Sequence, residues 1–281
     1  MIVVTGATGN VGRPLVQALA AAGEEVTAVS RRPADSGQRP AARVHHRQAD
    51  PAEPDSLRPL LDGADALYLL IAGGGAQLDP QALLDAAKTA GVRRVVLQSS
   101  QLTGSRPDAV SHAALRAFES AVRGSGLDWT VLRPGGFFSN AFRWAEQVRE
   151  QRVLAAPFGD TALPLIDPAD IAEAAATTLV EEGHTGRTYE LTGPVPVTPR
   201  ELAAAIGAAV GAPVRFVEQS RAEARAQLLQ FMPEPVVEGT LDVLGAPSAA
   251  EQQVSPAVEQ LIGRPPRSFA EWALRHAEAF R

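Results

Sequence analysis

Three glycines near the N-terminus are spaced so that the backbone around them could hold a phosphate group. Gly6, Gly9 and Gly12 follow an apolar run at residues 2–5 and lead into a segment of helical period at 11–22. In such a loop the first glycine permits a tight turn, the second lets the backbone approach a pyrophosphate, and the third lets the helix pack closely. Backbone N–H groups and the positive end of the helix dipole would then receive the phosphates. The spacing predicts a dinucleotide site; a tight turn that binds nothing is the alternative.

Two arginines follow the second predicted strand, at the position that selects between dinucleotides. Arg31 and Arg32 come directly after the run at residues 25–30, and no acidic residue occurs there before Asp35. An acid at this position would bind the ribose 2′-hydroxyl of NAD, whereas an arginine accommodates the 2′-phosphate of NADP. The predicted cofactor is NADP(H), unless both side chains are only solvated surface charges.

A histidine and an arginine could supply a proton or a charge for a transfer reaction. His112 and Arg116 stand four residues apart, so both side chains share one face of a predicted helix near 109–124. A histidine that titrates near neutrality could protonate an alkoxide or enolate, and the arginine could bind a phosphate or lower the pKa of the histidine. In the alternative interpretation, Asp108 or Ser111 caps the helix and His112 is a solvent-exposed residue of its first turn.

The composition excludes several other kinds of site. The sequence contains no cysteine, which rules out thiolate nucleophiles, disulfides and cysteine-ligated metals. No H-E-x-x-H or H-x-x-x-H pattern indicates a metal site, and no G-x-S-x-G pattern indicates a serine hydrolase. The formal net charge of −6 and the lack of basic runs argue against nucleic acid or an anionic membrane as a partner. A small molecule is the expected partner.

The sequence also carries no targeting pattern. The N-terminal segment lacks the features of a signal peptide, and no apolar run approaches the length needed to span a bilayer. We therefore expect a cytoplasmic protein. The sequence does not distinguish a monomer from a homodimer.

The segments that must position these residues alternate between β-branched or apolar runs and alanine-rich stretches of helical period. This alternation predicts an α/β fold with a doubly wound parallel (Rossmann) sheet, because buried parallel strands are joined by helices. We assign residues 1–134 to an NAD(P)-binding core and 135–281 to a smaller, mainly helical substrate lobe. A strand near 187–193 is expected to rejoin the main sheet. The expected core strands lie at 2–5, 25–30, 43–48, 66–71, 93–100 and 128–133.

The second half of the chain contains further helices. One is predicted at 168–182, and its acidic residues Asp167 and Asp170 resemble a catalytic carboxylate pair. We interpret them as structural, with Asp170 placed to start the helix, because a carboxylate stabilises a helix N-terminus. Four helices are expected between 199 and 281, separated by prolines.

Taken together, these motifs resemble those of the NmrA-like atypical short-chain dehydrogenase/reductases. The resemblance covers nearly the whole chain and implies a Rossmann fold that binds NAD(P). The segments that carry it, in the family's order, are VTGATGNVG, VSRRP, AAKTAGVRRVVLQSS, SGLDWTVLRPGGFFSN, DPADIAEAA and GRTYELTGP.

The resemblance implies roles for individual residues. Those implied in cofactor binding are Thr8, Asn10 and Val11 in the glycine loop, Arg31 at the 2′-phosphate, Ala49 and Asp50 at the adenine, Ala72 and Gly73 near the nicotinamide ribose, and Ser99 and Ser100 at the nicotinamide end. The residues implied in closing the pocket are Pro134 through Phe138, which include Phe137, and in addition Asn140. A hydroxyl of Ser99 or Ser100 could also contact the substrate.

The catalytic pair of the larger superfamily is missing from this chain. That pair is a tyrosine, which protonates the carbonyl oxygen, and a lysine four residues later. The two tyrosines here are Tyr68 and Tyr189, neither is followed by a lysine at that distance, and Lys88 lies in a different predicted helix. The reaction should therefore need little acid catalysis.

These features favour an NADPH-dependent reductase that transfers hydride to a small substrate such as a quinone, imine, conjugated enone or ketone. A pocket wall of Phe137, Phe138, Phe142 and Trp144 would suit a flat, apolar substrate, although these side chains could equally form the core of the lobe. Two alternatives stay open. One is a regulatory protein that senses NADP(H) without catalysis, and the other is an isomerase or epimerase that retains its cofactor.

Overall fold

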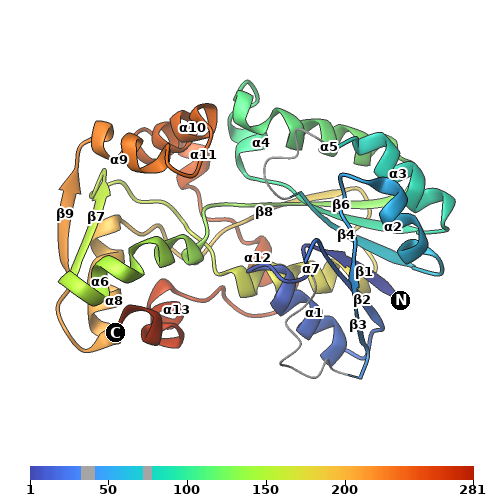
Figure 1. The fold of residues 1–281 in the computed structure, drawn as a ribbon, viewed down its shortest axis with the longest axis horizontal. Coiled ribbons are helices and arrows are strands. Elements are labelled where there is room, and N and C mark those ends of the chain that lie inside the picture. The colour runs from blue at the N-terminus through green and yellow to red at the C-terminus, as the bar shows by residue number, and fades with distance from the viewer. Residues whose placement is uncertain (33–41, 72–77) are drawn as a thin grey trace.

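The computed structural model describes residues 1–32, 42–71 and 78–281, and its largest element is a sheet of seven strands (Figure 1). The strand order is β3-β2-β1-β4-β5-β6-β8, and every neighbouring pair is parallel. These strands are β1 (Ile2–Thr5), β2 (Val26–Ser30), β3 (Val44–Gln48), β4 (Ala66–Leu70), β5 (Arg94–Gln98), β6 (Asp128–Pro134) and β8 (Arg187–Leu191). The predicted doubly wound α/β fold is confirmed.

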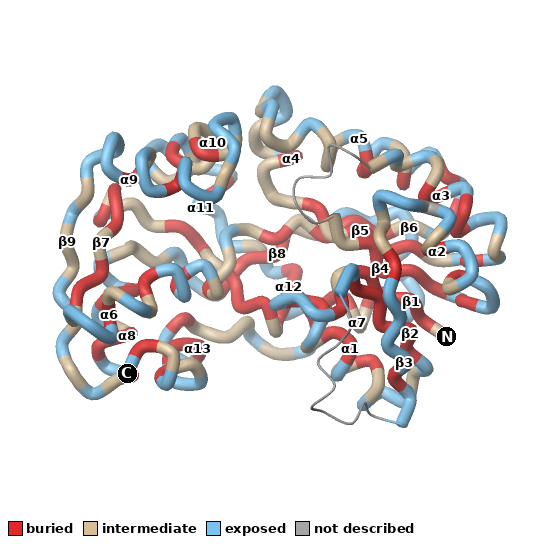
Figure 2. The backbone as a smooth tube through the Cα atoms, in the orientation of Figure 1, coloured by how far each residue is buried: buried red, intermediate tan, exposed pale blue. Residues whose placement is uncertain are grey.

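Helices cover both faces of this sheet, because successive side chains of a strand point to opposite faces. Val4 belongs to the core on one face and its neighbour Val3 to the core on the other, and Figure 2 shows buried residues concentrated along the strands. The helices on the face of Val4 are α1 (Gly12–Ala21), α7 (Pro168–Val180) and α12 (Ala257–Ile262). Those on the face of Val3 are α2 (Pro54–Leu61), α3 (Pro80–Thr89) and α5 (Ala113–Gly124).

A smaller unit lies at the other end of the molecule and is built around two parallel strands, β7 (Val153–Pro157) and β9 (Arg215–Gln219) (Figure 1). Its core is rich in aromatic side chains. The buried aromatic residues are Phe138, Trp144, Phe269, Trp272 and Phe280. They come from the 3₁₀ segment η3 (Phe138–Trp144), from α13 (Phe269–Arg275) and from the terminal segment η4 (Ala277–Phe280).

The prediction of four helices after residue 199 is wrong. Six α-helices and the strand β9 follow: α8 (Pro199–Val210), α9 (Arg221–Leu228), α10 (Glu234–Gly245), α11 (Ala249–Gln252), α12 and α13. Four of these helices begin with a capping box, in which a Ser or Thr and a Glu three residues later satisfy each other's backbone N–H groups. The prediction used only the prolines as helix boundaries, whereas these boxes start helices as short as four residues.

The strand expected near 187–193 is β8, and it belongs to the main sheet. It pairs with β6 in parallel, with Arg187 opposite Thr130 and Leu191 opposite Pro134. The helices α7 and α12, which also follow residue 134, pack on the same sheet. The chain thus passes between the two units more than once, and the division at residue 134 stays a prediction.

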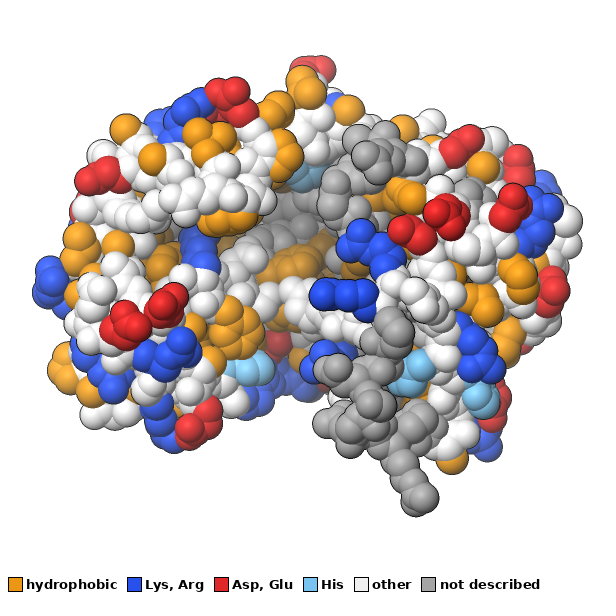
Figure 3. Space-filling view, viewed as in Figure 1, with side chains coloured by type: hydrophobic (Ala, Val, Ile, Leu, Met, Phe, Trp, Pro, Cys, Tyr) orange, Lys and Arg blue, Asp and Glu red, His pale blue; other side chains and the backbone are white. Residues whose placement is uncertain are grey.

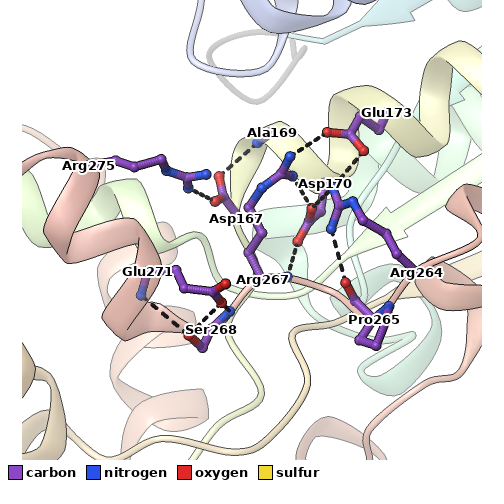
Figure 4. Close-up of polar contacts among 10 residues, drawn as sticks. All are labelled: Asp167, Ala169, Asp170, Glu173, Arg264, Pro265, Arg267, Ser268, Glu271 and Arg275. Carbon is purple, nitrogen blue, oxygen red and sulfur yellow. Dashed lines mark hydrogen bonds and ion pairs between the residues drawn. The ribbon is translucent and has the colours of Figure 1, made fainter.

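Asp167 starts α7 and ties it to the C-terminal helix (Figure 4). Its side chain accepts a hydrogen bond of 2.9 Å from the backbone N–H of Ala169 and forms an ion pair with Arg275. The residue that caps the helix is therefore Asp167 and not Asp170, because the cap carboxylate must precede the first turn to accept its free N–H groups.

Asp170 is fully buried and holds the segment that leads into α13 (Figure 4). It accepts hydrogen bonds from Arg264 Nη2 at 2.8 Å and from the backbone N–H of Arg267 at 2.7 Å, and it also pairs with the Arg267 guanidinium. Glu173, one turn later, binds the same two arginines at 2.5 and 2.7 Å. Both aspartates are thus engaged by the protein itself, in agreement with the structural interpretation.

Candidate active site

The glycine loop between β1 and α1 has a shape that only glycine allows. Gly6 adopts a positive φ of 65°, which side chains disfavour. A Cβ atom on Gly12 would lie 2.1 Å from the carbonyl oxygen of Gly6, well inside the contact distance of two heavy atoms. The first turn of α1 therefore packs directly against the loop that precedes it.

The N-terminus of α1 is open to an anionic ligand. Val11 occupies the N-cap position without a side-chain cap, and no acidic residue stands in the first turn. Thr8, Gly9 and Asn10 are exposed at the same place. Free backbone N–H groups at an uncompensated helix N-terminus bind phosphate, so this loop fits the pyrophosphate of a dinucleotide.

The carboxyl ends of β2 and β3 lie beside this loop and would hold the adenosine part of the cofactor. Arg31 and Arg32 are exposed directly after β2, and neither forms an ion pair with a described residue. Ala49 is buried and Asp50 half-buried after β3, the neighbour of β2. Two guanidinium groups at this edge suit the 2′-phosphate of NADP(H). The predicted contacts Ala72 and Gly73 lie outside the described residues.

Replacing Arg31 by alanine should weaken NADPH binding by about 10- to 100-fold, which corresponds to the loss of one charge-assisted contact to phosphate, and should leave NADH binding within about threefold. Titration of nicotinamide fluorescence with each cofactor measures both effects. Arg93→Ala is the matched control. Arg93 is an exposed arginine that pairs with Asp65, and it precedes β5, so it lies at the amino ends of the strands and not at the carboxyl ends. Equal losses for both cofactors would contradict the assignment of Arg31 to the 2′-phosphate.

A cavity of about 230 Å³ lies between the carboxyl edge of the main sheet and the smaller unit. Figure 3 shows a hollow between the two units, with apolar side chains on its floor and basic side chains on its visible walls. The predicted residues that line the cavity are Ser100, Pro134, Phe137, Phe138, Asn140 and Trp144. Most other lining side chains are apolar, and they include Leu163, Leu165, Val197, Leu202, Val243 and Leu244. The cavity therefore suits a small, largely apolar molecule.

The prediction for Phe142 is wrong in one respect, because this side chain does not line the cavity. Its ring lies 4.9 Å from that of Trp272 and 5.3 Å from that of His276, on the outer side of the lobe core. In the 3₁₀ geometry of η3 the side chains rotate by a third of a turn per residue, so neighbouring aromatics face different directions.

A hydrogen bond connects the glycine loop to the segment that lines the cavity. Asn10 Nδ2 donates to Ser139 Oγ at 2.9 Å, across 129 residues of sequence. Ser139 stands in η3 between Phe138 and Asn140, which both line the cavity. The loop itself follows β1, where the strand order reverses between β1 and β4, and this reversal is where open α/β sheets bind ligands. The glycine loop is thus in direct contact with the segment that lines the cavity.

Beneath this site, Glu119 is a buried carboxylate that the sequence interpretation did not select. It accepts hydrogen bonds from Ser99 Oγ and Thr103 Oγ1 at 2.6 Å each, and from Arg133 at 2.7 and 2.9 Å. Although burial alone would raise its pKa, the hydrogen bonds and charge of Arg133, together with those two hydroxyls, hold the pKa of Glu119 at about 2. The Ser99 hydroxyl is therefore committed to an ionised carboxylate, and only Ser100 faces the cavity.

His112 and Arg116 are both half-buried, so His112 is not the freely exposed residue of the alternative interpretation. Burial, and then the charge of Arg116, lower the pKa of His112, so the imidazole is mostly neutral at neutral pH. The segment η2 (Val110–His112) packs against α10, where a Cβ on Gly239 would lie 3.0 Å from Ser111 Oγ. Neither His112 nor Arg116 lines the cavity. Their catalytic roles stay predictions without geometric support.

The tyrosines and the lysine are used elsewhere in the fold. Tyr68 is fully buried and donates to Gln98, and burial raises the pKa of its hydroxyl. Tyr189 contacts His184 at 2.9 Å, and Lys88 donates to the carbonyl of Ser125 at 3.1 Å. None of the three lines the cavity.

In the described ranges, no group of three or more His, Asp or Glu side chains could hold a metal ion. The described helices also include none that is long and apolar enough to cross a bilayer.

The sequence and the fold are similar to those of known proteins. Residues 6–182 match a protein family described as NAD(P)H-binding. The chain is 38% identical over 283 residues to the (4-alkanoyl-5-oxo-2,5-dihydrofuran-3-yl)methyl phosphate reductase of Streptomyces griseus, with 100% of this chain and 99% of that protein covered. It is 33% identical over 285 residues to the NAD(P)H azoreductase of Xenophilus azovorans, with 100% and 99% covered. The solved structure of an NADPH-dependent quinone oxidoreductase from Escherichia coli, complexed with NADPH, matches with a TM-score of 0.83 and 28% identity, covering 98% of this chain and 99% of that one.

Proposed function

Because the chain belongs to the NAD(P)H-binding family, as its resemblance to NmrA-like reductases predicted, we propose that it is an NADPH-dependent reductase of small conjugated acceptors. The observation that supports this most is the hydrogen bond from Asn10 in the glycine loop to Ser139, which stands in the segment that lines the apolar cavity. A bound acceptor would lie against the carboxyl edge of the sheet, where the nicotinamide end of a dinucleotide belongs.

Different residues of the chain would bind different parts of the cofactor and of the acceptor. The N-terminus of α1 would hold the pyrophosphate, and Arg31 with Arg32 would hold the 2′-phosphate. NADPH, when bound, supplies a hydride. Ser100 and Asn140 offer the cavity a hydroxyl and an amide that could orient a carbonyl oxygen, and the apolar walls exclude water from the acceptor.

The acceptor should need little help from an acid. The described residues that line the cavity include no histidine, tyrosine or lysine, and the one acid among them, Glu251, is held ionised by Arg106. Quinones, conjugated enones and protonated imines (iminium ions) fit this site. Hydride addition to a quinone or an enone leaves a delocalised anion that takes a proton from water, and addition to an iminium ion leaves a neutral amine. The names of the relatives, which include a furanone phosphate reductase, an azoreductase and a quinone oxidoreductase, support the same class.

A panel of acceptors tests this proposal. Purified protein should oxidise NADPH in the presence of at least one cyclic enone, naphthoquinone or imine, and the loss of nicotinamide absorbance measures the rate. Saturated ketones, which would leave a basic alkoxide, should react more slowly. Tight NADPH binding without oxidation across the panel would instead favour a regulatory protein that senses the cofactor.

A further inference from the structure

Arg143 places an uncompensated positive charge in the cavity. The charged residues that line the cavity are Arg143 and Glu251. Glu251 is buried and bound by Arg106 at 2.7 and 2.9 Å and by Ser105 at 2.8 Å, so its charge is neutralised inside the protein. Arg143 forms no ion pair and no hydrogen bond with any residue in 1–32, 42–71 or 78–281. Among the charged residues that line the cavity, Arg143 is therefore the one that no described residue neutralises.

The position of Arg143 is well defined although it has no acidic partner. The ring N–H of Trp144 donates to the carbonyl oxygen of Ala155 at 2.9 Å, which orients the indole. The guanidinium carbon of Arg143 lies 4.3 Å from the centroid of that ring. Stacking on an aromatic face leaves the N–H edge of a guanidinium free to bind a ligand. The arginine is thus oriented for recognition before any ligand arrives.

Another arginine of the same unit shows what a purely structural stack looks like. Arg200 lies 4.6 Å above the ring of Phe216, but its N–H groups are bound to Asp160 and Glu218, both at 2.9 Å. It is absent from the cavity lining. Arg143 has the same kind of stacking, but no acid among the described residues binds its N–H groups, so they are free to bind an anionic ligand.

The guanidinium of Arg143 is accessible to a ligand. The residue is exposed to solvent, although the protein atoms packed around the guanidinium lower its pKa to about 10. The group stays charged at neutral pH, so it can bind an anion that enters the cavity.

We propose that Arg143 binds an anionic group, a phosphate monoester or a carboxylate, on the acceptor that this site reduces. This inference rests on the proposed function and refines it: the substrate is a small conjugated ring or chain with a negatively charged substituent. The conjugated part lies against Ser100 and the apolar walls, and the charged substituent reaches the guanidinium. Arg143 therefore sets specificity and orientation, and it takes no part in hydride transfer.

The test compares three cyclic enones that differ only in one substituent: hydroxymethyl, carboxymethyl or phosphooxymethyl, the last being a phosphate monoester. The wild type should reduce the two anionic compounds with a kcat/KM about 10- to 100-fold higher than the neutral one, the effect of one charged hydrogen-bonded contact. Arg143→Met should remove this preference and leave the neutral compound within about threefold. Arg143→Lys should keep part of the preference for the anionic compounds. It should keep more of the preference for the carboxylate than for the phosphate if two N–H groups of Arg143 bind the phosphate.

Two controls make the result specific. Arg200→Met removes a stacked arginine from the same unit outside the cavity and should leave the preference unchanged. The NADPH dissociation constant of Arg143→Met should equal that of the wild type. A loss of NADPH affinity would overturn the inference, because it would assign Arg143 to the cofactor. Equal kcat/KM for charged and neutral compounds in the wild type would overturn it too, while the reductase function would stand.

Failure of the proposed function gives a different pattern. If no enone is reduced, binding of the three compounds is measured by calorimetry with NADP+ present. Weaker binding of the anionic compounds to Arg143→Met than to the wild type would still support an anion site. Equal binding to both proteins would overturn it.

Discussion

Replacing Gly12 by alanine should weaken NADPH binding by about 10- to 100-fold, which corresponds to a clash worth about 1–3 kcal/mol in a packed region. The added Cβ would lie 2.1 Å from the carbonyl oxygen of Gly6 and 2.8 Å from its carbonyl carbon. Both are backbone atoms, which cannot move aside as the end of a flexible side chain could. The loop or the helix must shift, and with it the N–H groups that receive the pyrophosphate. Fluorescence titration with NADPH measures the loss.

Two further variants separate binding from folding. Gly124→Ala is the matched control, because a Cβ there meets nothing within 4 Å and the residue ends a helix far from the loop. Gly9→Ala introduces a milder contact of 3.2 Å in the same loop, and its side chain would point into solvent. It should fold normally and bind NADPH with an intermediate affinity. Full NADPH affinity in Gly12→Ala would mean that the loop is not the pyrophosphate site.

Replacing Asp170 by alanine should reduce the free energy of unfolding by about 3–5 kcal/mol, the cost of removing one partner from a buried ion pair. Asp170 is fully buried and neutralises part of the charge of Arg264 and Arg267. Without it, these guanidinium groups keep only Glu173. The C-terminal segment would then be attached to α7 by fewer ion pairs, those of Glu173 and of Asp167 with Arg275. Urea denaturation measures the change, with the free energy of unfolding assumed to depend on urea concentration with the same slope in both proteins.

The control for Asp170→Ala is Asp160→Ala. Asp160 also pairs with an arginine, Arg200, but its side chain is 86% exposed. A solvent-exposed pair contributes about 0–1 kcal/mol. Similar losses in the two variants would show that burial of Asp170 adds nothing to its contribution, and would contradict the account of this network.

The main sheet was predictable from the sequence because its strands are short, apolar and buried on both sides. Val3 and Val4 illustrate this: each faces a different helical layer, so the strand reads as a continuous apolar run. The glycine loop was predictable for a related reason, since Gly6 and Gly12 have backbone requirements that no other residue meets. Both the strands and the loop are thus determined by residues that are close together in the sequence.

The parts that sequence reasoning missed depend on distant partners. Glu119 looks like an ordinary surface residue of a helix, and it becomes a buried ionised carboxylate only because the sheet brings Ser99 and Arg133 to it. The segment η2, which ends at His112, likewise packs against α10, more than 120 residues later in the chain. Arg143 attracts attention only once Glu251 is seen to be paired with Arg106. β9 carries a weak strand pattern because it pairs on one side only, with β7.

The most direct test of the proposed function is the fate of the hydride. NADPH labelled with deuterium at the transferred position of the nicotinamide is mixed with the protein and a cyclic enone, and the product is analysed by mass spectrometry and NMR. The proposal predicts one deuterium on the carbon β to the carbonyl, a position that does not exchange with water, and one proton from solvent on the neighbouring carbon. The variant Gly12→Ala should give the same labelled product at a lower rate under subsaturating NADPH. Oxidation of NADPH without deuterium in the product, or no oxidation with any conjugated acceptor, would contradict the proposed function.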